Sequence, residues 1–249
     1  MQLPFKENCL PLNDNYELSR KRLFSTWKKL KENKELLNEY DKIFTNQLDQ
    51  GIIEEAGPLS VFDASYRTEG PSLNESLSTG PSLTPSLFGV LARFRAHNIV
   101  VIGDIEKAFH QISVHPDDRN FLRFLWFKNV NELDNNCFEN NELIEYRFSR
   151  VVMGITSSPF LLSEILNKHI KSHAENAQFA EKVLDSIHVD DLTAGEESES
   201  KAYTLYENCK QTLKKASFNL RKFKSNSKVL ESWIVRDYGQ NELEIKICL

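Results

Sequence analysis

A continuous apolar run, NIVVIGD (98–104), is the feature that most constrains the fold of this chain. Such a run is typical of a β-strand that is buried on both faces. It ends at Asp104, where a core strand would meet the surface. A second apolar stretch, SIHVDDLTAG (186–195), predicts a strand, a tight turn that holds Asp190 and Asp191, and a second strand. The sequence thus places three carboxylates at the ends of apolar strands.

The rest of the chain mixes helical and strand patterns. Apolar residues at helical spacing predict helices over 13–50, 86–97, 158–171 and 196–216, one or two helical turns over 105–112, and an extension or separate helix over 174–184. Aromatic and branched residues predict strands over Leu59–Phe62, Phe121–Phe127, Ile144–Phe148 and 218–223. Turn-forming residues predict loops over 65–86 and 129–142. The predicted fold class is α+β, with helices packed on a mainly antiparallel sheet and no internal domain boundary.

Composition excludes several classes of protein. The 249 residues are 40% hydrophobic, which is enough to bury a sizeable core and excludes a wholly disordered chain. The net charge of −5 provides no global basic field, so nucleic acid would have to bind at local patches. The four cysteines lie far apart, which argues against a zinc knuckle or a dense disulfide framework. Without a signal peptide or a run of membrane-spanning length, we expect an intracellular protein of the cytoplasm or nucleus that has no membrane partner.

The acidic residues suggest a specific chemistry. An acid at the rim of an apolar strand costs free energy unless it is solvated, paired or bound to a metal. Adjacent carboxylates such as Asp190 and Asp191 raise each other's pKa, and a divalent cation would remove that cost. Together with Asp104 they could hold two metal ions about 4 Å apart, as in phosphoryl transfer. A solvated Asp-Asp turn is the alternative that spacing leaves open.

A series of short motifs narrows these alternatives. In chain order they are VFDAS (61–65), SLN (72–74), LARFR (91–95), DIEKAFHQI (104–112), LRFLW (122–126), YRFSRVVMG (146–154), SSPFLL (157–162), VDDL (189–192) and FNLRKFKSN (218–226). Their order resembles the reverse transcriptase domain of Pao/BEL-type long-terminal-repeat retrotransposons, a group of transposable elements. The resemblance covers nearly the whole chain, from about Leu3 to Asn226.

The resemblance implies the palm of a right-hand polymerase together with incomplete fingers. Such a palm is built on a split βαβ, ferredoxin- or RRM-like antiparallel sheet with helices. The chain would be a single reverse-transcriptase-like unit over residues 1–249. Residues 1–100 would form N-terminal helices and partial fingers, residues 98–226 the palm, and residues 227–249 a truncated tail toward a missing thumb.

The resemblance also assigns roles to the three acids. Asp104 matches the first metal-binding aspartate of the family, and Asp190 and Asp191 match the second and third. Their implied role is to hold two Mg²⁺ ions, with Mn²⁺ as an alternative, which activate the primer 3′-hydroxyl and neutralise the triphosphate. The implied partners are an RNA or DNA template-primer and deoxynucleoside triphosphates.

Two further groups of residues match binding segments of the family. The nucleotide-binding group is Ile105, whose carbonyl would complete the metal shell, Phe109, which would stack under the incoming sugar and exclude a 2′-hydroxyl, and Met153 and Gly154. The primer- or template-binding group is Asn219, Leu220, Arg221 and Lys222. Core packing is the alternative for Phe109, and a solubility role is the alternative for the basic strand edge.

Three departures from the family pattern bear on activity. His188 stands where relatives have an aromatic residue, usually Tyr, and Mg²⁺ prefers oxygen ligands to its imidazole. Relatives place a fingers hairpin and a basic residue before the strand that matches VFDAS, where this chain has Leu59 and Ser60. The thumb is expected to be missing after residue 226. These departures predict an RNA-directed DNA polymerase with impaired synthesis.

Two other functions stay open from the sequence. One is a catalytically inactive retrotransposon remnant that folds and binds nucleic acid or protein. The other is a two-metal nuclease or phosphatase, because paired carboxylates also serve hydrolysis.

Overall fold

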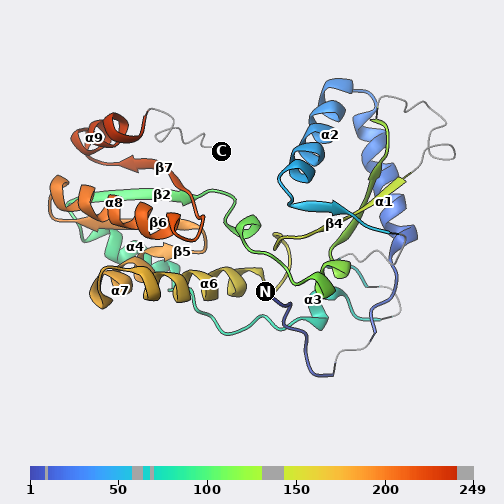
Figure 1. The fold of residues 1–249 in the computed structure, drawn as a ribbon, viewed down its shortest axis with the longest axis horizontal. Helices are drawn as coiled ribbons and strands as arrows, with labels where there is room; N and C mark the ends of the chain where they lie inside the picture. The colour runs from blue at the N-terminus through green and yellow to red at the C-terminus, as the bar shows by residue number, and fades with distance from the viewer. Residues whose placement is uncertain (9–10, 58–63, 68–69, 131–142, 240–249) are drawn as a thin grey trace. The chain divides into compact units, whose positions relative to one another are not determined.

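The computed structural model describes residues 1–8, 11–57, 64–67, 70–130 and 143–239, which fold into two compact units (Figure 1). The first unit comprises Met1–Gly80 and Ile112–Ser158, and the second comprises Pro81–Gln111 and Pro159–Leu249. The segment from residue 112 to 158, which falls inside the expected palm, therefore belongs to the first unit. The predicted strand at Leu59–Phe62 lies outside the described residues, as does most of the predicted loop at 129–142.

The first unit is a small antiparallel sheet with helices. Its elements are α1 (Tyr16–Leu30), α2 (Lys34–Asp49), β1 (Ile53–Glu55), α3 (Leu73–Ser76), the 3-10 helix η2 (Pro116–Phe121), β3 (Arg123–Phe127) and β4 (Leu143–Phe148). The strands pair in the order β1-β4-β3. The predicted strands near 121–127 and 144–148 are confirmed as β3 and β4. Strand β1 was not predicted, because three residues are too few to show an alternating pattern.

The helical prediction over 13–50 is confirmed in type but wrong as a single run. Helix α1 ends at Leu30, and α2 begins after Asn33, whose side chain accepts a hydrogen bond from the backbone N–H of Leu36 at 3.1 Å. Such a cap satisfies a backbone donor that would otherwise have no partner, so it favours a new helix start. Gly51 ends the region with φ of +62°.

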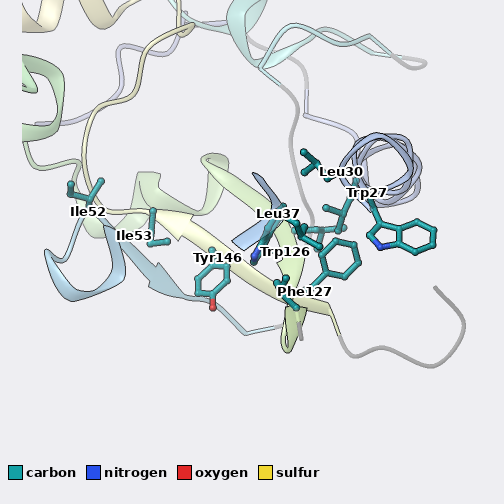
Figure 2. Close-up of a cluster of buried hydrophobic side chains, with 11 residues drawn as sticks. Trp27, Leu30, Leu37, Ile52, Ile53, Trp126, Phe127 and Tyr146 are labelled. Carbon is teal, nitrogen blue, oxygen red and sulfur yellow. The ribbon is translucent and has the colours of Figure 1, made fainter. Parts of the chain in front are cut away.

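The core of the first unit lies between α1, α2 and the sheet (Figure 2). Helix α1 presents Trp27 and Leu30 to this core, and β3 contributes Trp126 and Phe127. The indole N–H of Trp126 donates to the Asp41 carboxylate at 2.9 Å, so this large side chain is buried without losing its hydrogen bond. Spacing along α1 thus determines which face of the helix packs on the sheet.

The second unit carries the acidic residues. Its elements are α4 (Leu87–Arg95), β2 (Ile99–Ile105), the 3-10 helix η1 (Ala108–Gln111), α6 (Ser158–His173), α7 (Ala177–Ser186), β5 (Ile187–His188), β6 (Asp191–Glu196), α8 (Glu199–Lys214), β7 (Leu220–Ser225) and α9 (Lys228–Tyr238). The strands form an antiparallel sheet in the order β5-β6-β2-β7 (Figure 1). Helix α8 contacts β2, β6 and β7, while α4 and α7 contact β5 and β6. The α+β class with an antiparallel sheet is confirmed.

Strand β2 is the expected apolar strand, but the prediction that it is buried on both faces is wrong. Val101 and Ile105 are buried, whereas Ile102 and Asp104 on the alternate face are only half-buried. Side chains alternate between the two faces of a strand, so one face of β2 belongs to the core and the other is partly open. Because β2 lies between β6 and β7, its position still requires mostly apolar residues.

The predicted helices of this unit are confirmed as α4, α6 and α8, and the predicted turns at 105–112 as η1. The question left open for 174–184 is resolved as a separate helix, α7, which Asn176 begins by accepting from the backbone N–H of Phe179 at 2.8 Å. Helix α9 was not predicted. Its signals are the Ser227 cap and the spacing of buried Leu230 and Ile234. No helix in the described part of the chain is both long and apolar enough to cross a membrane.

Gly103 allows β7 to lie close to β2 directly beside Asp104. A Cβ atom on Gly103 would lie 3.0 Å from the buried Phe223 ring and 3.4 Å from Leu220. We therefore expect Gly103→Ala to lower the free energy of unfolding by about 1–3 kcal/mol, as other overpacked cores do. Urea denaturation measures this change. Gly57→Ala is the control because nothing lies within 4 Å of its added Cβ; equal effects of the two substitutions would contradict the packing explanation.

Candidate active site

The three acids lie at one end of the sheet in the second unit. Asp104 of β2 is the register partner of Asp191 at the start of β6. Directly opposed residues of an antiparallel pair have Cα atoms about 4.5–5.5 Å apart and point to the same face. The backbone N–H of Ile105 donates to the carbonyl of Asp190 at 2.9 Å, which fixes the adjacent turn against β2. Strand pairing therefore brings residues more than 80 positions apart to one site.

The predicted tight turn between the two flanking strands is confirmed. Val189 and Asp190 connect β5 to β6, and Val189 has φ of +62°. This left-handed conformation is unusual for a branched side chain and costs about 1–3 kcal/mol. Backbone strain of this kind is found mostly at functional sites, where it fixes a side chain in place.

Burial and mutual repulsion disfavour charge on the acidic pair. The pKa of Asp190 is raised, first by burial and then by the charge of Asp104. The pKa of Asp191 is raised by burial and by the charges of Asp190 and Asp104. His188 and Lys222 act in the opposite direction on the pKa of both groups. The site thus holds negative charge that its own residues compensate only in part.

Lys222 of β7 is the cation beside the first acid. Its Nζ lies 3.2 Å from Oδ2 of Asp104. The pairing of β7 with β2 shifts between Ile102 and Asp104, so that Lys222 and Phe223 together face Gly103. Lys222 has φ of +58° in this bulge. Bulges commonly redirect a side chain next to an active site, and this one accompanies an ion pair to Asp104.

An open cavity of about 300 Å³ lies at this group. Its lining residues are Ile102, Gly103, Asp104, Asp191, Leu192, Thr193 and Lys222. The cavity thus combines two carboxylates and an ammonium group with apolar walls. Such walls lower the local dielectric and strengthen charge interactions with anything that binds there.

The acids fit a divalent cation by their chemistry. Carboxylate oxygens are the ligands that Mg²⁺ prefers, and the raised pKa values of Asp190 and Asp191 report negative charge that a cation would neutralise. In the described part of the chain, however, no group of three or more His, Cys, Asp or Glu side chains is already arranged around one point as metal ligands. The carboxylates are therefore the right type of ligand for Mg²⁺, but the three of them are not already arranged around a single metal position.

The predicted nucleotide-binding residues are divided between the two units. In the second unit, Ile105 is buried in β2, and Phe109 lies in η1 with only 7% of its surface exposed. In the first unit, the side chain of Met153 is 71% exposed and Gly154 has φ of +88°. Core packing explains the burial of Phe109 without a ligand, and its stacking role stays a prediction.

A residue that the sequence did not identify holds the Met153–Gly154 loop of the first unit. The side-chain amide of Asn74 donates to the carbonyl of Gly154 at 3.0 Å, and its side-chain oxygen accepts from the N–H of Thr156 at 2.8 Å. Asn74 lies in the SLN motif, so the motif draws attention to this residue. Nothing in the sequence, however, indicates which loop its side chain contacts.

The predicted primer-binding residues lie on β7 and just before it. Leu220 is fully buried, so its side chain has a core role. Asn219 donates to Oε2 of Glu106 at 2.9 Å, and Arg221 donates to Oε1 of Glu106 at 2.5 Å. These bonds and the positive charge of Arg221 lower the pKa of Glu106 against the opposing effect of burial, the largest single contribution. Sequence reasoning missed Glu106, although it lies two residues after Asp104.

His188 occupies a structural position next to the pair of acids. It is the register partner of Asp191, and its Nδ1 lies 3.3 Å from the carbonyl of Pro85. One ring nitrogen is therefore oriented by the backbone. This contact accounts for the position of the His188 side chain without any metal ligation.

An antiparallel sheet that carries three carboxylates at one end, with helices packed on it, is consistent with the palm-type domain of a nucleic-acid polymerase. The sequence comparison agrees with this class. Residues 39–241 match the protein family described as reverse transcriptase (RNA-dependent DNA polymerase). Because the match includes most of the chain, the protein belongs to this family.

A comparison with solved structures supports the fold independently. The chain is similar to the foamy viral protease-reverse transcriptase, which was solved in complex with an RNA/DNA hybrid, with a TM-score of 0.55 and 14% sequence identity. The match covers 76% of this chain and 24% of that one, so this chain spans about a quarter of its length. No curated protein matches the sequence.

Proposed function

We propose that this chain is an RNA-directed DNA polymerase domain that transfers deoxynucleotides to a primer end. The observation that carries the proposal is the pairing of Asp104 with Asp191, beside Asp190, at the end of a sheet in a chain of this family. Family members generally use divalent metal ions. In this chain Asp104, Asp190 and Asp191 would hold them, as two Mg²⁺ ions or with Mn²⁺ instead.

The chemistry is an in-line displacement at phosphorus. The primer 3′-hydroxyl gives up its proton to solvent water and attacks the α-phosphate, an O–P bond forms, and the bond to the leaving pyrophosphate breaks. Bound divalent cations supply neutralisation of the triphosphate and activation of the hydroxyl. The protein supplies three carboxylates at one edge of the sheet and a nearby ammonium group, and Asp104, Asp191 and Lys222 line a partly apolar cavity there.

Several finer assignments belong to the same proposal. We assign the chain to the Pao/BEL-type elements, because its motifs follow the order of that group. Residues 98–226 are assigned to the palm and part of 1–100 to the fingers. Ile105 and Phe109, which both belong to the second unit, are assigned to the incoming deoxynucleotide. A template-primer is the proposed partner, and the cytoplasm or nucleus is the proposed location.

Primer extension tests the proposed activity. The 249-residue chain is incubated with a DNA primer on an RNA template, deoxynucleoside triphosphates and Mg²⁺. We expect incorporation of at least one nucleotide, and its complete loss when EDTA removes the divalent ion. Salt-dependent binding of the template-primer without any extension would contradict a polymerase and support a non-catalytic nucleic-acid-binding protein. Cleavage of the labelled strand would instead support a nuclease.

A further inference from the structure

Strand β7 carries Lys222 to the acidic site, but it is an edge strand. Among the strands in the described residues, the sheet order β5-β6-β2-β7 leaves it paired with β2 alone. The bulge at Lys222 and Phe223 interrupts that pairing beside Asp104. Edge strands with interrupted pairing are weakly held by backbone hydrogen bonds alone. Other contacts must therefore fix the position of the bulge.

Two of these contacts are made by Phe223 in the bulge and by Ser225 at the C-terminal end of β7. The Phe223 ring is fully buried against Tyr206 of α8, with ring centroids 3.9 Å apart. At the C-terminal end of β7, the Ser225 hydroxyl donates to the carbonyl of Val100 at 2.7 Å. These contacts hold the end of the strand and the core-facing residue of the bulge.

The N-terminal end of β7 is held by Glu106. Its backbone N–H donates to the carbonyl of Asn219, and its two carboxylate oxygens accept from the side chains of Asn219 and Arg221. The distances are 2.9, 2.9 and 2.5 Å. Arg221 is the register partner of Asp104 and directly precedes Lys222. One side chain therefore joins the segment after Asp104 to the two residues that lead into the bulge.

We propose that Glu106 is a positioning residue of the polymerase site, which holds Asn219 and Arg221 and thereby fixes the Lys222 ammonium beside Asp104. This inference rests on the proposed function for its catalytic consequence. It gives Asn219 and Arg221 a structural role, since their polar groups bond to Glu106. A charge-assisted pair of this geometry is stronger than a neutral hydrogen bond and restricts orientation as well as distance.

The test compares Glu106→Gln, Arg221→Met and the double variant with the wild-type chain. Glu197→Gln is the matched control, because Glu197 also accepts from a basic side chain, Lys201, at 2.8 Å but lies on the exposed surface of the same unit. Hydrogen exchange of peptides that cover β7 is measured with β6 as an internal reference. Single-nucleotide incorporation then gives kcat and KM, and a titration gives the template-primer Kd.

We expect Glu106→Gln to speed exchange in β7 about tenfold while β6 and the Glu197→Gln variant stay unchanged. We also expect kcat of Glu106→Gln to fall about tenfold, while KM for the nucleotide and the template-primer Kd stay unchanged. This pattern is expected when a residue that orients a group of the active site is lost but the binding contacts remain. The double variant should show the same exchange rate and kcat as the more impaired single variant, because the two single substitutions remove the same interaction.

Other outcomes overturn the proposal. Unchanged exchange in β7 would show that Glu106 does not hold the strand. If the wild-type chain is active, and Glu106→Gln shows faster exchange in β7 but the same kcat as wild type, the position of the strand does not matter for the reaction. A rise in template-primer Kd for Arg221→Met at constant kcat would return Arg221 to primer binding. If the wild-type chain incorporates nothing, the proposed function fails, and the exchange data still decide whether Glu106 anchors β7.

Discussion

Replacement of Asp104 by Asn is expected to reduce nucleotide incorporation by about 10³-fold or more. The substitution keeps the size of the side chain and removes the charge that faces Asp191 across the strand pair. A bound divalent ion contributes several kcal/mol of charge stabilisation in the transition state, and each 1.4 kcal/mol corresponds to about a factor of ten in rate. Single-turnover primer extension with saturating Mg²⁺ measures the effect.

Asp185→Asn is the control for this experiment. Asp185 is an exposed acid on α7 of the same unit and has no place in the acidic site. Its replacement changes the net charge by the same amount, so long-range electrostatic effects on nucleic-acid binding are matched. Circular dichroism confirms that both variants are folded. An Asp104→Asn variant that extends primers as well as Asp185→Asn would contradict the assignment of Asp104.

Replacement of Asp190 by Asn is expected to abolish incorporation to a similar extent while making the protein more stable. The pKa of Asp190 is raised above its ordinary value of 3.8, mainly by burial and then by Asp104. A carboxyl group with a raised pKa contributes stability that is full below the pKa of the unfolded chain and is lost as the pH rises through the folded value. At neutral pH the charged Asp190 is therefore destabilising, and the neutral Asn relieves this cost.

The expected gain at pH 7 is about 0.5–1 kcal/mol, since the site is partly exposed and solvent screens the repulsion. Urea denaturation at a series of pH values measures it. The difference between Asp190→Asn and wild type should shrink as the pH falls toward the ordinary range of aspartate carboxyl groups, where the wild-type side chain becomes neutral. A variant that is less stable than wild type at pH 7 would show that the Asp190 charge is well compensated, contrary to the raised pKa.

Local patterns in the sequence predicted most of the elements and the place of the acids. The apolar run before Asp104 and the two short strands around Val189 and Asp190 are continuous in the chain, so their type could be read directly. Antiparallel pairing of two such strands then brings their acidic ends together. The family resemblance supplied the role of these acids, which spacing alone left open between a metal site and a solvated turn.

The features that the sequence could not reveal depend on contacts between distant segments. The bulge at Lys222 depends on how Phe223 packs beside Gly103, and no local signal marks a bulge there. Glu106 resembles any exposed acid in the sequence, since its partners lie over 110 positions away. The open face of β2 was missed for the same reason, because an apolar run does not show which neighbours leave one face uncovered.

The binding of Mn²⁺ to the wild-type chain and its Asn variants tests whether Asp104 and Asp191 share metal ions. The chain is saturated with a template annealed to a dideoxy-terminated primer and with the next deoxynucleotide, and bound Mn²⁺ is counted by electron paramagnetic resonance. We expect about two ions per wild-type complex, and affinity at least tenfold weaker when either Asp104 or Asp191 is replaced by Asn. Equal Mn²⁺ binding by wild type and Asp104→Asn would show that the acids of β2 and β6 do not share a metal.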